Sequence, residues 1–304
     1  MAMERSRSLR TQLVSRISEL GVAADSPVAR AFRSVPREAF VHGIPLEDVY
    51  KDRAITTKTR EGILTSSSSQ PSLMARMLSR IDVQPGQNVL EVGTGTGYNA
   101  ALLADLVGPR GTVTTVDIDP EVAAAAAESL KAAGYERVEV VAGDGGLGFA
   151  ENAPYDRIIV TAGVWQIPPP WTHQLSTEGG MVLPLRVNGS ALAPLLRPDG
   201  EGLSGRGADP CSFIALAGAF AGGYDYELRS GLVARSDRAL RPSEARAIDF
   251  LLTESGRDDA GLPDLRGDET DTLAFYHYLQ LQGLYPFSFS IPRVCLGSGS
   301  TRCS

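Results

Sequence analysis

Long apolar runs are absent from this 304-residue sequence, and it carries no surplus of basic charge. No stretch reaches the roughly 18 apolar residues of a membrane-spanning helix, and the basic start of the chain is not followed by the apolar core of a secretion signal. The formal charge of −7 repels phosphate backbones and anionic membrane surfaces. We therefore expect a cytoplasmic protein that binds neither nucleic acid nor membrane.

Cysteine and histidine are scarce, with three of each in the chain. Cys211, Cys295 and Cys303 are an odd set without the close spacing of metal ligands, which fits a reducing cytosol better than a disulfide framework and predicts no metal site. His42 and the other two histidines lie in no recognisable catalytic motif. Hydrophobic residues make up 43% of the chain, which is enough for a full core.

The first 70 residues predict two helices and then a loop. Apolar residues recur at helical spacing up to Leu20, where Gly21 stops the pattern. A second short helix is expected through VARAFRSV, beginning at Ser26-Pro27. Residues 43–70 follow neither the helical nor the strand period, so we expect them to be loop-like.

From Pro71 onward, helix-type and strand-type segments alternate. This order is the mark of an α/β fold with a doubly wound, mainly parallel sheet. The expected elements are, in order, SLMARMLSRI (helix), NVLEVG (strand), NAALLADLVG (helix), GTVTTVDI (strand), PEVAAAAAESLKAAG (helix), VEVVAGD (strand) and YDRIIVTA (strand). A later strand is expected in GGMVLPLR with Gly179-Gly180 as its entry turn, and CSFIALAGAF is a candidate for one last core strand.

The chain is expected to divide into three segments. Residues 1–70 form an N-terminal helical lid, residues 71–223 the α/β core, and residues 224–304 a C-terminal appendage with helical patterns in PSEARAIDFLLT and DTLAFYHYLQLQG. Aromatic residues of the appendage, Phe275 and Tyr276 among them, either grip a peptide or pack the appendage onto the core.

A glycine-rich segment, EVGTGTGY at Glu91–Tyr98, lies between an expected strand and an expected helix, where a backbone without side chains can approach a ligand. Dinucleotide binding requires G-x-G-x-x-G, but Tyr98 stands where the third glycine would be. The spacing E-x-G-x-G-x-G instead resembles the first motif of class I methyltransferases that depend on S-adenosylmethionine. A simple tight turn is the alternative.

Two acidic residues support the methyltransferase interpretation. Asp117 ends the second strand, where a carboxylate can accept both ribose hydroxyl protons, although it could instead cap a helix, a role that suits Asp119 better. Asp144 ends the third strand, where such enzymes hold adenine, unless it serves a plain turn. The residues expected to bind the cofactor S-adenosylmethionine are Glu91, Gly93, Thr94, Gly95, Gly97, Tyr98, Asp117, Ile118, Asp144, Gly145 and Thr161.

A set of ordered motifs resembles one branch of that superfamily, the protein L-isoaspartyl O-methyltransferases. The motifs are VPREAFV, YKDRAI, the Ser69-Gln70-Pro71 step, VLEVGTGTGYNAALLA, GDG, YDRIIVTA, and QL followed by GGMVLPL. In that family the step before Gln-Pro usually reads Thr-Ile-Ser, whereas here it reads Ser67-Ser68-Ser69. The resemblance implies that Ser69 is the active-site serine; capping of the helix that starts at Pro71 is the alternative.

The resemblance also implies a reaction. Ser69 would orient a substrate carboxylate toward the methyl group, with Ser67, Ser68, Gln70 and Trp165 as substrate-binding residues. Ser68 in place of an apolar residue should make the floor of the site more polar or roomier. Since a carboxylate is already ionised at pH 7, no general base is required.

The resemblance also implies a substrate, and alternatives to it remain. The substrate is expected to be a peptide or protein with an aspartyl or isoaspartyl residue, whose methyl ester then closes to a succinimide. The serine run and the appendage favour an enzyme that tailors a ribosomally made peptide, with general protein repair as the alternative. A small-molecule O-methyltransferase and an inactive cofactor-binding module are further alternatives.

Overall fold

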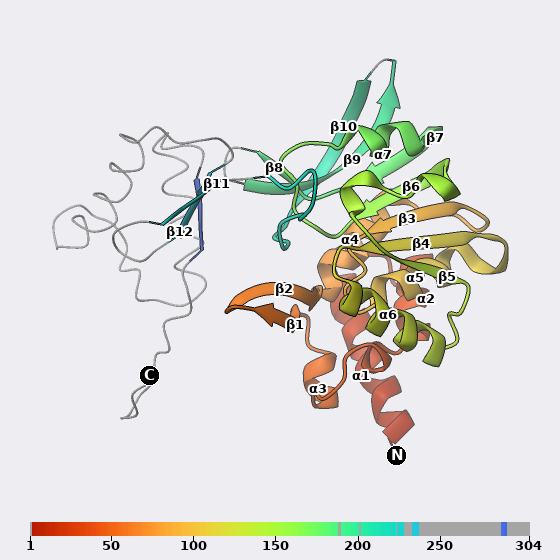
Figure 1. Cartoon of the computed structure of the whole chain (residues 1–304). Coiled ribbons are helices and arrows are strands. Elements are labelled where there is room, and N and C mark those ends of the chain that lie inside the picture. The colour runs from red at the N-terminus through yellow and green to blue at the C-terminus, as the bar shows by residue number, and fades with distance from the viewer. Residues whose placement is uncertain are drawn as a thin grey trace, which may run out of the picture. The chain divides into compact units, whose positions relative to one another are not determined.

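The chain forms two compact units, which are described separately. The computed structural model describes residues 2–187, 190–200, 202–222, 224–227, 233–236 and 287–290 (Figure 1). One unit comprises Met1–Leu185 with Ala191–Gly222, and the other Arg186–Ser190 with Gly223–Ser304. The expected lid and the expected core thus belong to one unit. The three-segment division with boundaries at 70 and 223 stays a prediction.

A twisted, mainly parallel sheet forms the centre of the first unit. Its strands follow the order β10-β9-β7-β6-β3-β4-β5. Pairing is parallel from β7 through β6, β3 and β4 to β5, and antiparallel between β7 and β9 and between β9 and β10. The strands are β3 (Asn88–Val92), β4 (Thr112–Asp117), β5 (Val138–Ala142), β6 (Tyr155–Val160), β7 (Leu175–Val182), β9 (Ser190–Asp199) and β10 (Gly202–Pro210). The doubly wound α/β prediction is confirmed.

Helices cover both faces of this sheet because the strands are apolar on both faces. Along β3 the side chains alternate: Val89 joins one hydrophobic cluster, whereas Leu90 and Val92 join the other. The first cluster receives α1 (Ala2–Glu19), α2 (Pro27–Ser34), α4 (Pro71–Ile81), α5 (Tyr98–Val107) and α6 (Pro120–Ala132). The second cluster contains the fully buried Trp171 of α7 (Pro169–Gln174).

The two predicted N-terminal helices are confirmed as α1 and α2. Gly21, just beyond α1, has φ of +102°, a left-handed conformation that glycine adopts without strain. Ser26 caps α2, since its hydroxyl accepts from the amide of Ala29 at 3.1 Å. Ile17 of α1 and Phe32 of α2 are fully buried, so both helices belong to the core of the first unit.

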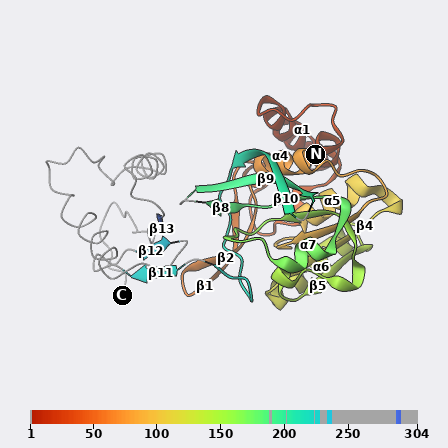
Figure 2. The same ribbon diagram turned by 90° about the horizontal axis from the view of Figure 1, so that it is seen from above.

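The prediction that residues 43–70 are loop-like was wrong. They contain α3 (Leu46–Val49) and an antiparallel hairpin of β1 (Ile55–Arg60) and β2 (Ile63–Ser68), which stands apart from the central sheet in Figure 1 and Figure 2. The hairpin turns at Glu61-Gly62 with φ of +52° and +79°, as a two-residue hairpin loop requires. Its strands are mostly exposed and polar, so they lack the apolar alternation by which a strand is recognised.

Two further predictions about the late strands need correction. Gly179-Gly180 is no entry turn but lies inside β7, which already begins at Leu175. A Cβ on Gly179 would come within 2.7 Å of the Leu175 side chain, so close packing explains that glycine. The segment CSFIALAGAF is no core strand: Ala215 forms only an isolated bridge to Gly163. The sheet instead continues through the β9–β10 hairpin. This hairpin was not predicted, because its prolines and glycines are unfavourable in strands.

In the second unit, the described residues form a three-stranded antiparallel sheet. Its strands are β11 (Tyr224–Glu227), β12 (Val233–Ser236) and β13 (Phe287–Ser290), with β12 in the middle. The two helical patterns expected in the appendage, with Phe275 and Tyr276 in the second of them, lie outside the described residues. Strand β8 (Leu185–Val187) spans the boundary between the units. Across the described part of the chain, no helix has the length and apolarity to cross a bilayer.

Candidate active site

The glycine loop follows β3, at the point of the sheet where connections leave toward β4 on one side and β6 on the other, a typical ligand-binding position in such folds. Gly93, Gly95 and Gly97 all have positive φ, at +97°, +52° and +84°. A Cβ on Gly93 would lie 2.5 Å from Oγ1 of Thr161. That hydroxyl donates to the Gly93 carbonyl at 2.7 Å, so Thr161 holds the loop in place. A side chain on Gly93 would therefore collide with Thr161 and displace the loop.

Glu91 lies beneath this loop and is fully buried. Its carboxylate accepts from Nδ2 of Asn99 at 2.7 Å and from Oγ1 of Thr115 at 2.6 Å, and Thr115 in turn is bonded to Thr94 at 2.8 Å. Burial raises the pKa of Glu91 to about 7. The prediction that Glu91 binds the cofactor is therefore corrected. The alternation of side chains along β3 turns Glu91 toward α5, where its hydrogen bonds support the loop from below.

The side chain of Tyr98, at the end of the loop, also lies below the surface, since only 2% of the residue is exposed. Its ring packs edge-on against Phe32, with 6.0 Å between the ring centroids, and at a tilt against Phe40, with 5.8 Å between the centroids. The Arg37 guanidinium carbon lies 5.8 Å from the same ring centre. The Tyr98 side chain thus anchors the start of α5 to the N-terminal helices and is not available to the cofactor, so any part of Tyr98 in cofactor binding falls to its backbone.

Asp117 and Ile118 end β4 beside the glycine loop. One Asp117 oxygen accepts from the Gly95 amide at 3.0 Å and the other from the Asp119 amide at 3.1 Å. Each carboxylate oxygen keeps a second lone pair, so both can still accept a ribose hydroxyl. Burial raises the pKa of Asp117. Asp119 caps α6, as expected, and the Ile118 side chain is 46% exposed, which leaves an apolar surface next to the carboxylate.

Asp144 and Gly145 follow β5 and are held by two other segments. Asp144 accepts from the amide of Gly146 at 2.9 Å and from the amide of Ala219 at 2.6 Å. The indole nitrogen of Trp171 donates to the Gly145 carbonyl at 2.8 Å. Asp144 therefore serves a local turn, as the alternative interpretation had it, and also binds a distant segment; it can still accept from a ligand.

The serine run reaches this loop from the end of β2. A Cβ on Gly95 would lie 3.0 Å from the carbonyl oxygen of Ser67, so the serine segment and the glycine loop are in direct contact. Ser69 and Ser67 are half-buried. Ser68 is only 2% exposed, and its hydroxyl accepts from Nη2 of Arg37 at 3.3 Å. The expectation that Ser68 contacts substrate is thus corrected: its hydroxyl is turned into the protein by the alternation of β2.

Asp52, rather than Ser69, caps the helix that follows. The Ser72 amide donates to one oxygen of Asp52 at 2.8 Å, and Nε2 of Gln70 donates to the other at 3.2 Å. The cap position itself is Gln70, without a capping bond from its side chain. The alternative that Ser69 serves as a helix cap is therefore not supported, and among the residues that the structure describes no hydrogen bond occupies its hydroxyl.

Trp165 lies in the loop after β6 and is half-buried. A Cβ on Gly222 would come within 2.8 Å of its indole ring, so the ring packs against the end of the first unit. The assignment of Trp165 to substrate binding stays a prediction.

Three residues that hold the segments of the candidate site together escaped the sequence analysis: Arg37, Asp52 and Lys58. Arg37 is buried, Asp52 caps α4 from 20 positions upstream, and Lys58 bridges to α6. The signals available were an arginine beside a glutamate in VPREAFV and an aspartate in YKDRAI. Neither motif reveals its partners, because these lie across the fold.

Lys58 ties the hairpin to α6. Its Nζ lies 2.6 Å from Oδ2 of Asp119 and 2.7 Å from Oε2 of Glu121. A hollow of about 350 Å³ lies between the β1–β2 hairpin, residues 40–44 and α6, and it reaches Gly95 and Thr96. We expect Lys58→Met to speed hydrogen exchange of the β1–β2 amides several-fold, since partly exposed ion pairs add modestly to local stability.

Mass-spectrometric hydrogen exchange measures this effect. Lys51→Met is the matched control, because Lys51 pairs only with Asp48 inside the lid, at 2.6 Å. Added salt should bring the wild-type exchange rate toward that of the Lys58 variant. Equal exchange rates in both variants would show that the ion pair does not hold the hairpin.

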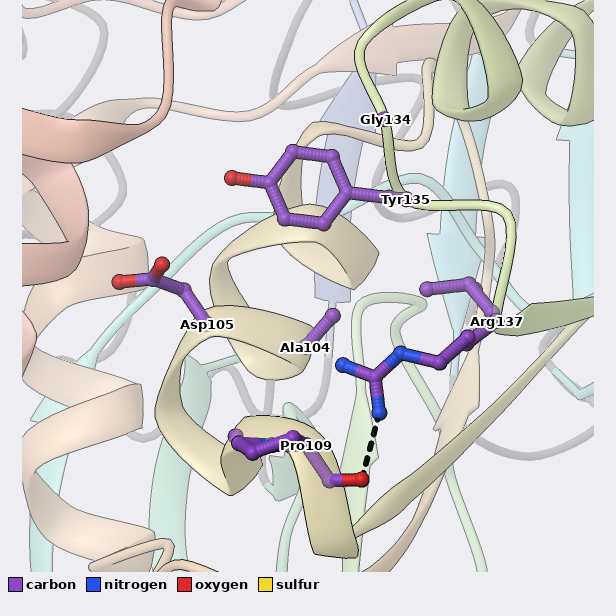
Figure 3. A pocket seen from close by; sticks show the side chains of 8 residues that line it. Ala104, Asp105, Pro109, Gly134, Tyr135 and Arg137 are labelled. Atoms are coloured by element: carbon purple, nitrogen blue, oxygen red, sulfur yellow. Dashed lines mark hydrogen bonds between the residues drawn. The ribbon is translucent and has the colours of Figure 1, made fainter.

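A second hollow, of about 280 Å³, lies at the opposite edge of the sheet, where β4 and β5 begin (Figure 3). Arg137 donates across it to the Pro109 carbonyl at 2.8 Å, and Asp105 and Tyr135 lie on its other side. None of the predicted site residues lines this hollow. Within the described ranges, no group of three or more His, Cys, Asp or Glu side chains is arranged to hold a metal ion.

The residues around the glycine loop fit S-adenosylmethionine. The three glycines of the loop have positive φ, Asp117 offers two carboxylate oxygens to a ribose, and the exposed Ile118 offers an apolar face to a purine. The serine segment lies in contact with Gly95 of the same loop. These residues would hold the cofactor, with Glu91, Thr94, Tyr98 and Thr161 in support.

Comparison with known proteins gives a consistent result. The family model of protein-L-isoaspartate(D-aspartate) O-methyltransferase matches residues 8–220. A protein-L-isoaspartate O-methyltransferase of Hyperthermus butylicus is 38% identical over 231 residues, which cover 73% of this chain and 93% of the relative. One of Methanopyrus kandleri is 40% identical over 215 residues, covering 70% and 92%.

Solved structures agree on the fold. A protein-L-isoaspartate O-methyltransferase matches with a TM-score of 0.65 and 27% identity, covering 82% of this chain and 93% of that structure. A Plasmodium falciparum protein solved in complex with S-adenosyl-L-homocysteine matches with a TM-score of 0.58 at 18% identity, covering 68% and 97%. At 18% identity, the match to the Plasmodium falciparum protein shows a common fold and nothing more.

Proposed function

Because this chain belongs to the protein-L-isoaspartate(D-aspartate) O-methyltransferase family, whose members are carboxyl methyltransferases dependent on S-adenosylmethionine, we propose that it methylates an isoaspartyl carboxylate in proteins or peptides. As the resemblance implies, the backbone nitrogen of the next residue then attacks the ester carbonyl, methanol leaves, and a succinimide forms. Protein repair is the general form of this activity.

The contact between the serine segment and the glycine loop carries this proposal. Ser67 and Gly95 are 28 positions apart in the sequence. Their backbones nevertheless meet, since a Cβ built on Gly95 would lie only 3.0 Å from the Ser67 carbonyl oxygen. A carboxylate bound at Ser69 would therefore lie beside the loop that holds the cofactor. Holding both reactants in one geometry is the main task in a transfer between two bound groups.

The chain's own groups need to bind and aim, and no proton has to be removed. S-adenosylmethionine supplies an electrophilic methyl group on a sulfonium. The hydroxyl of Ser69 donates to one oxygen of the substrate carboxylate and leaves the other free to attack. A carboxyl group with a pKa of about 4 is already ionised at pH 7, so no histidine is required. His42 and His173 are both exposed.

A narrower candidate is the tailoring of a ribosomally made peptide at aspartate. The family match ends at residue 220, and a second compact unit follows from Gly223. We propose this unit as the place of additional peptide recognition. The candidate differs from repair in its substrate, since the acceptor would be a normal aspartyl residue.

Labelled cofactor and matched peptides test the proposal. Two peptides of the same sequence, one with isoaspartate and one with aspartate, should be offered to the enzyme, and base-labile methyl ester counted. Ester on the isoaspartyl peptide alone is the expected result. Ester on the aspartyl peptide alone would favour tailoring, and ester on neither peptide would contradict both.

Ser69→Ala is expected to lower kcat about 10- to 100-fold on the isoaspartyl peptide. A hydrogen bond to a charged group contributes about 1.5–3 kcal/mol, and each 1.4 kcal/mol is a factor of ten. Affinity for S-adenosylhomocysteine, measured by calorimetry, should stay within about twofold, because the serine aims the substrate rather than holding the cofactor.

Ser66→Ala is the matched control for this variant. It removes a neighbouring hydroxyl that bonds to Thr57 at 3.1 Å inside the hairpin. Its kcat should remain within a few-fold of the wild type. If both variants lost kcat equally, Ser69 would have no special part in aiming the carboxylate.

A further inference from the structure

Arg37 lies in the interior of the lid with no exposed surface. It follows Pro36 as the first residue of a short 3₁₀ helix that ends at Ala39. A guanidinium stays charged in proteins, and a buried cation is costly unless its donors are satisfied. Burial lowers the pKa of Arg37, but the group remains a cation at neutral pH. The burial of a charged side chain at this free-energy cost indicates that Arg37 has a specific role.

The partners of Arg37 are carbonyl and hydroxyl oxygens instead of a carboxylate. Nη1 donates to Val49 and Lys51 carbonyls at 2.9 and 3.3 Å. Nη2 donates to the carbonyls of Arg53, Ser68 and Ser69 at 3.3, 3.3 and 3.0 Å, and to the Ser68 hydroxyl. One side chain thus joins the segment after α3 to the two serines that precede α4.

The same guanidinium also borders the cofactor loop. Its central carbon lies 5.8 Å from the ring centre of Tyr98, the residue with which α5 begins directly after Gly97. Asp52, the neighbouring carboxylate, binds the Ser72 amide and Gln70 on the far side of the serines. Ser69 is therefore fixed from two sides, by Arg37 at its carbonyl and by the Asp52 cap of α4 behind it.

We propose that Arg37 is a positioning residue for methyl transfer, which sets the backbone of Ser69 and with it the direction of the Ser69 hydroxyl. The inference rests on the proposed function. Rotation about the Ser69 backbone would move that hydroxyl, and an error of about 1 Å in such a group can cost a factor of about 100 in rate. A planar guanidinium can hold several carbonyls at once, which the ammonium of lysine cannot do in the same geometry.

Arg37→Lys tests this inference, since it retains the charge and loses the planar fork. On an isoaspartyl peptide we expect kcat to fall at least tenfold, while affinity for S-adenosylhomocysteine stays within about threefold. In a Ser69→Ala background the same change should cost less than threefold, because the residue through which Arg37 acts is already gone. Equal losses in both backgrounds would overturn the proposal, since they are the mark of a general structural defect.

Hydrogen exchange of residues 66–72 supplies a readout that does not depend on turnover. Arg37→Lys should speed exchange in this segment about tenfold, with residues 98–107 of α5 unchanged. If wild-type protein failed to methylate any isoaspartyl peptide, the proposed function would fail, and unchanged exchange would separately overturn the role of Arg37. Should Arg37→Lys not fold, Ser68→Ala removes one acceptor of Nη2 and should lower kcat several-fold; an unaltered kcat would count against the proposal.

Discussion

Gly93→Ala is expected to weaken binding of S-adenosylhomocysteine by about 100-fold or more. The new Cβ would lie 2.5 Å from Oγ1 of Thr161, a distance that real contacts do not show. The φ of +97° adds backbone strain of about 1–3 kcal/mol for a residue with a side chain. Thr161 must then move, and its bonds to the Val92 and Gly93 carbonyls, at 3.1 and 2.7 Å, are lost. Calorimetry with the purified protein measures the change.

A control variant separates the two effects of Gly93→Ala, the collision of the new Cβ with Thr161 and the backbone strain of a positive φ. Gly86 has a similar φ of +88°, but nothing lies within 4 Å of its would-be Cβ. Gly86→Ala should therefore reduce stability without changing affinity for the cofactor product. In Thr161→Ala protein the nearest remaining atom to the Gly93 Cβ is 3.6 Å away, an ordinary contact, so Gly93→Ala should cost much less there. An undiminished loss in that background would show that strain alone is responsible.

Those parts of the fold that have a strong local period could be predicted from the sequence. The helix at Pro71–Ile81 and the strands at Asn88–Val92 and Tyr155–Val160 carry apolar residues at regular spacing, and all three are present. The β1–β2 hairpin was missed because its residues are mostly exposed and polar, and β9–β10 because prolines and glycines interrupt the pattern. The strand propensity of single residues predicts little where a strand is stabilised by pairing with its neighbour and not by packing against a core.

The candidate site was predictable where backbone conformation dictates the residue type. Gly93, Gly95 and Gly97 all have the positive φ that their motif requires. The direction of side chains was not predictable. Glu91 and Ser68 both point into the protein, since alternate residues of a strand face opposite sides and the sequence does not say which side the ligand takes.

Glu91→Gln is expected to remove a pH dependence of stability that the wild type shows. Burial raises the pKa of Glu91 from 4.5 to about 7. Between these values the folded protein retains a proton that the unfolded chain has lost, so the free energy of unfolding falls as pH rises through this range. A difference of this size in pKa corresponds to about 3 kcal/mol of stability, fully present below pH 4.5 and lost above pH 7.

Glutamine fits the same cavity without a charge. Its amide can accept from Asn99 as Glu91 does and donate to Oγ1 of Thr115, which then donates to Thr94. Relative to the wild type, Glu91→Gln should therefore gain about 3 kcal/mol between pH 5 and pH 8, measured by urea unfolding at fixed pH. Below pH 5 the two proteins should differ little.

Glu128→Gln is the matched control for this comparison. Glu128 is exposed on α6, away from the buried carboxylate, so its removal changes the net charge by the same amount. A shift common to both variants would come from net charge alone. If Glu91→Gln followed the wild-type stability across the whole range, the buried carboxyl would be ionised at neutral pH in the folded protein. The hydrogen bonds from Asn99 and Thr115 would then outweigh the cost of burial.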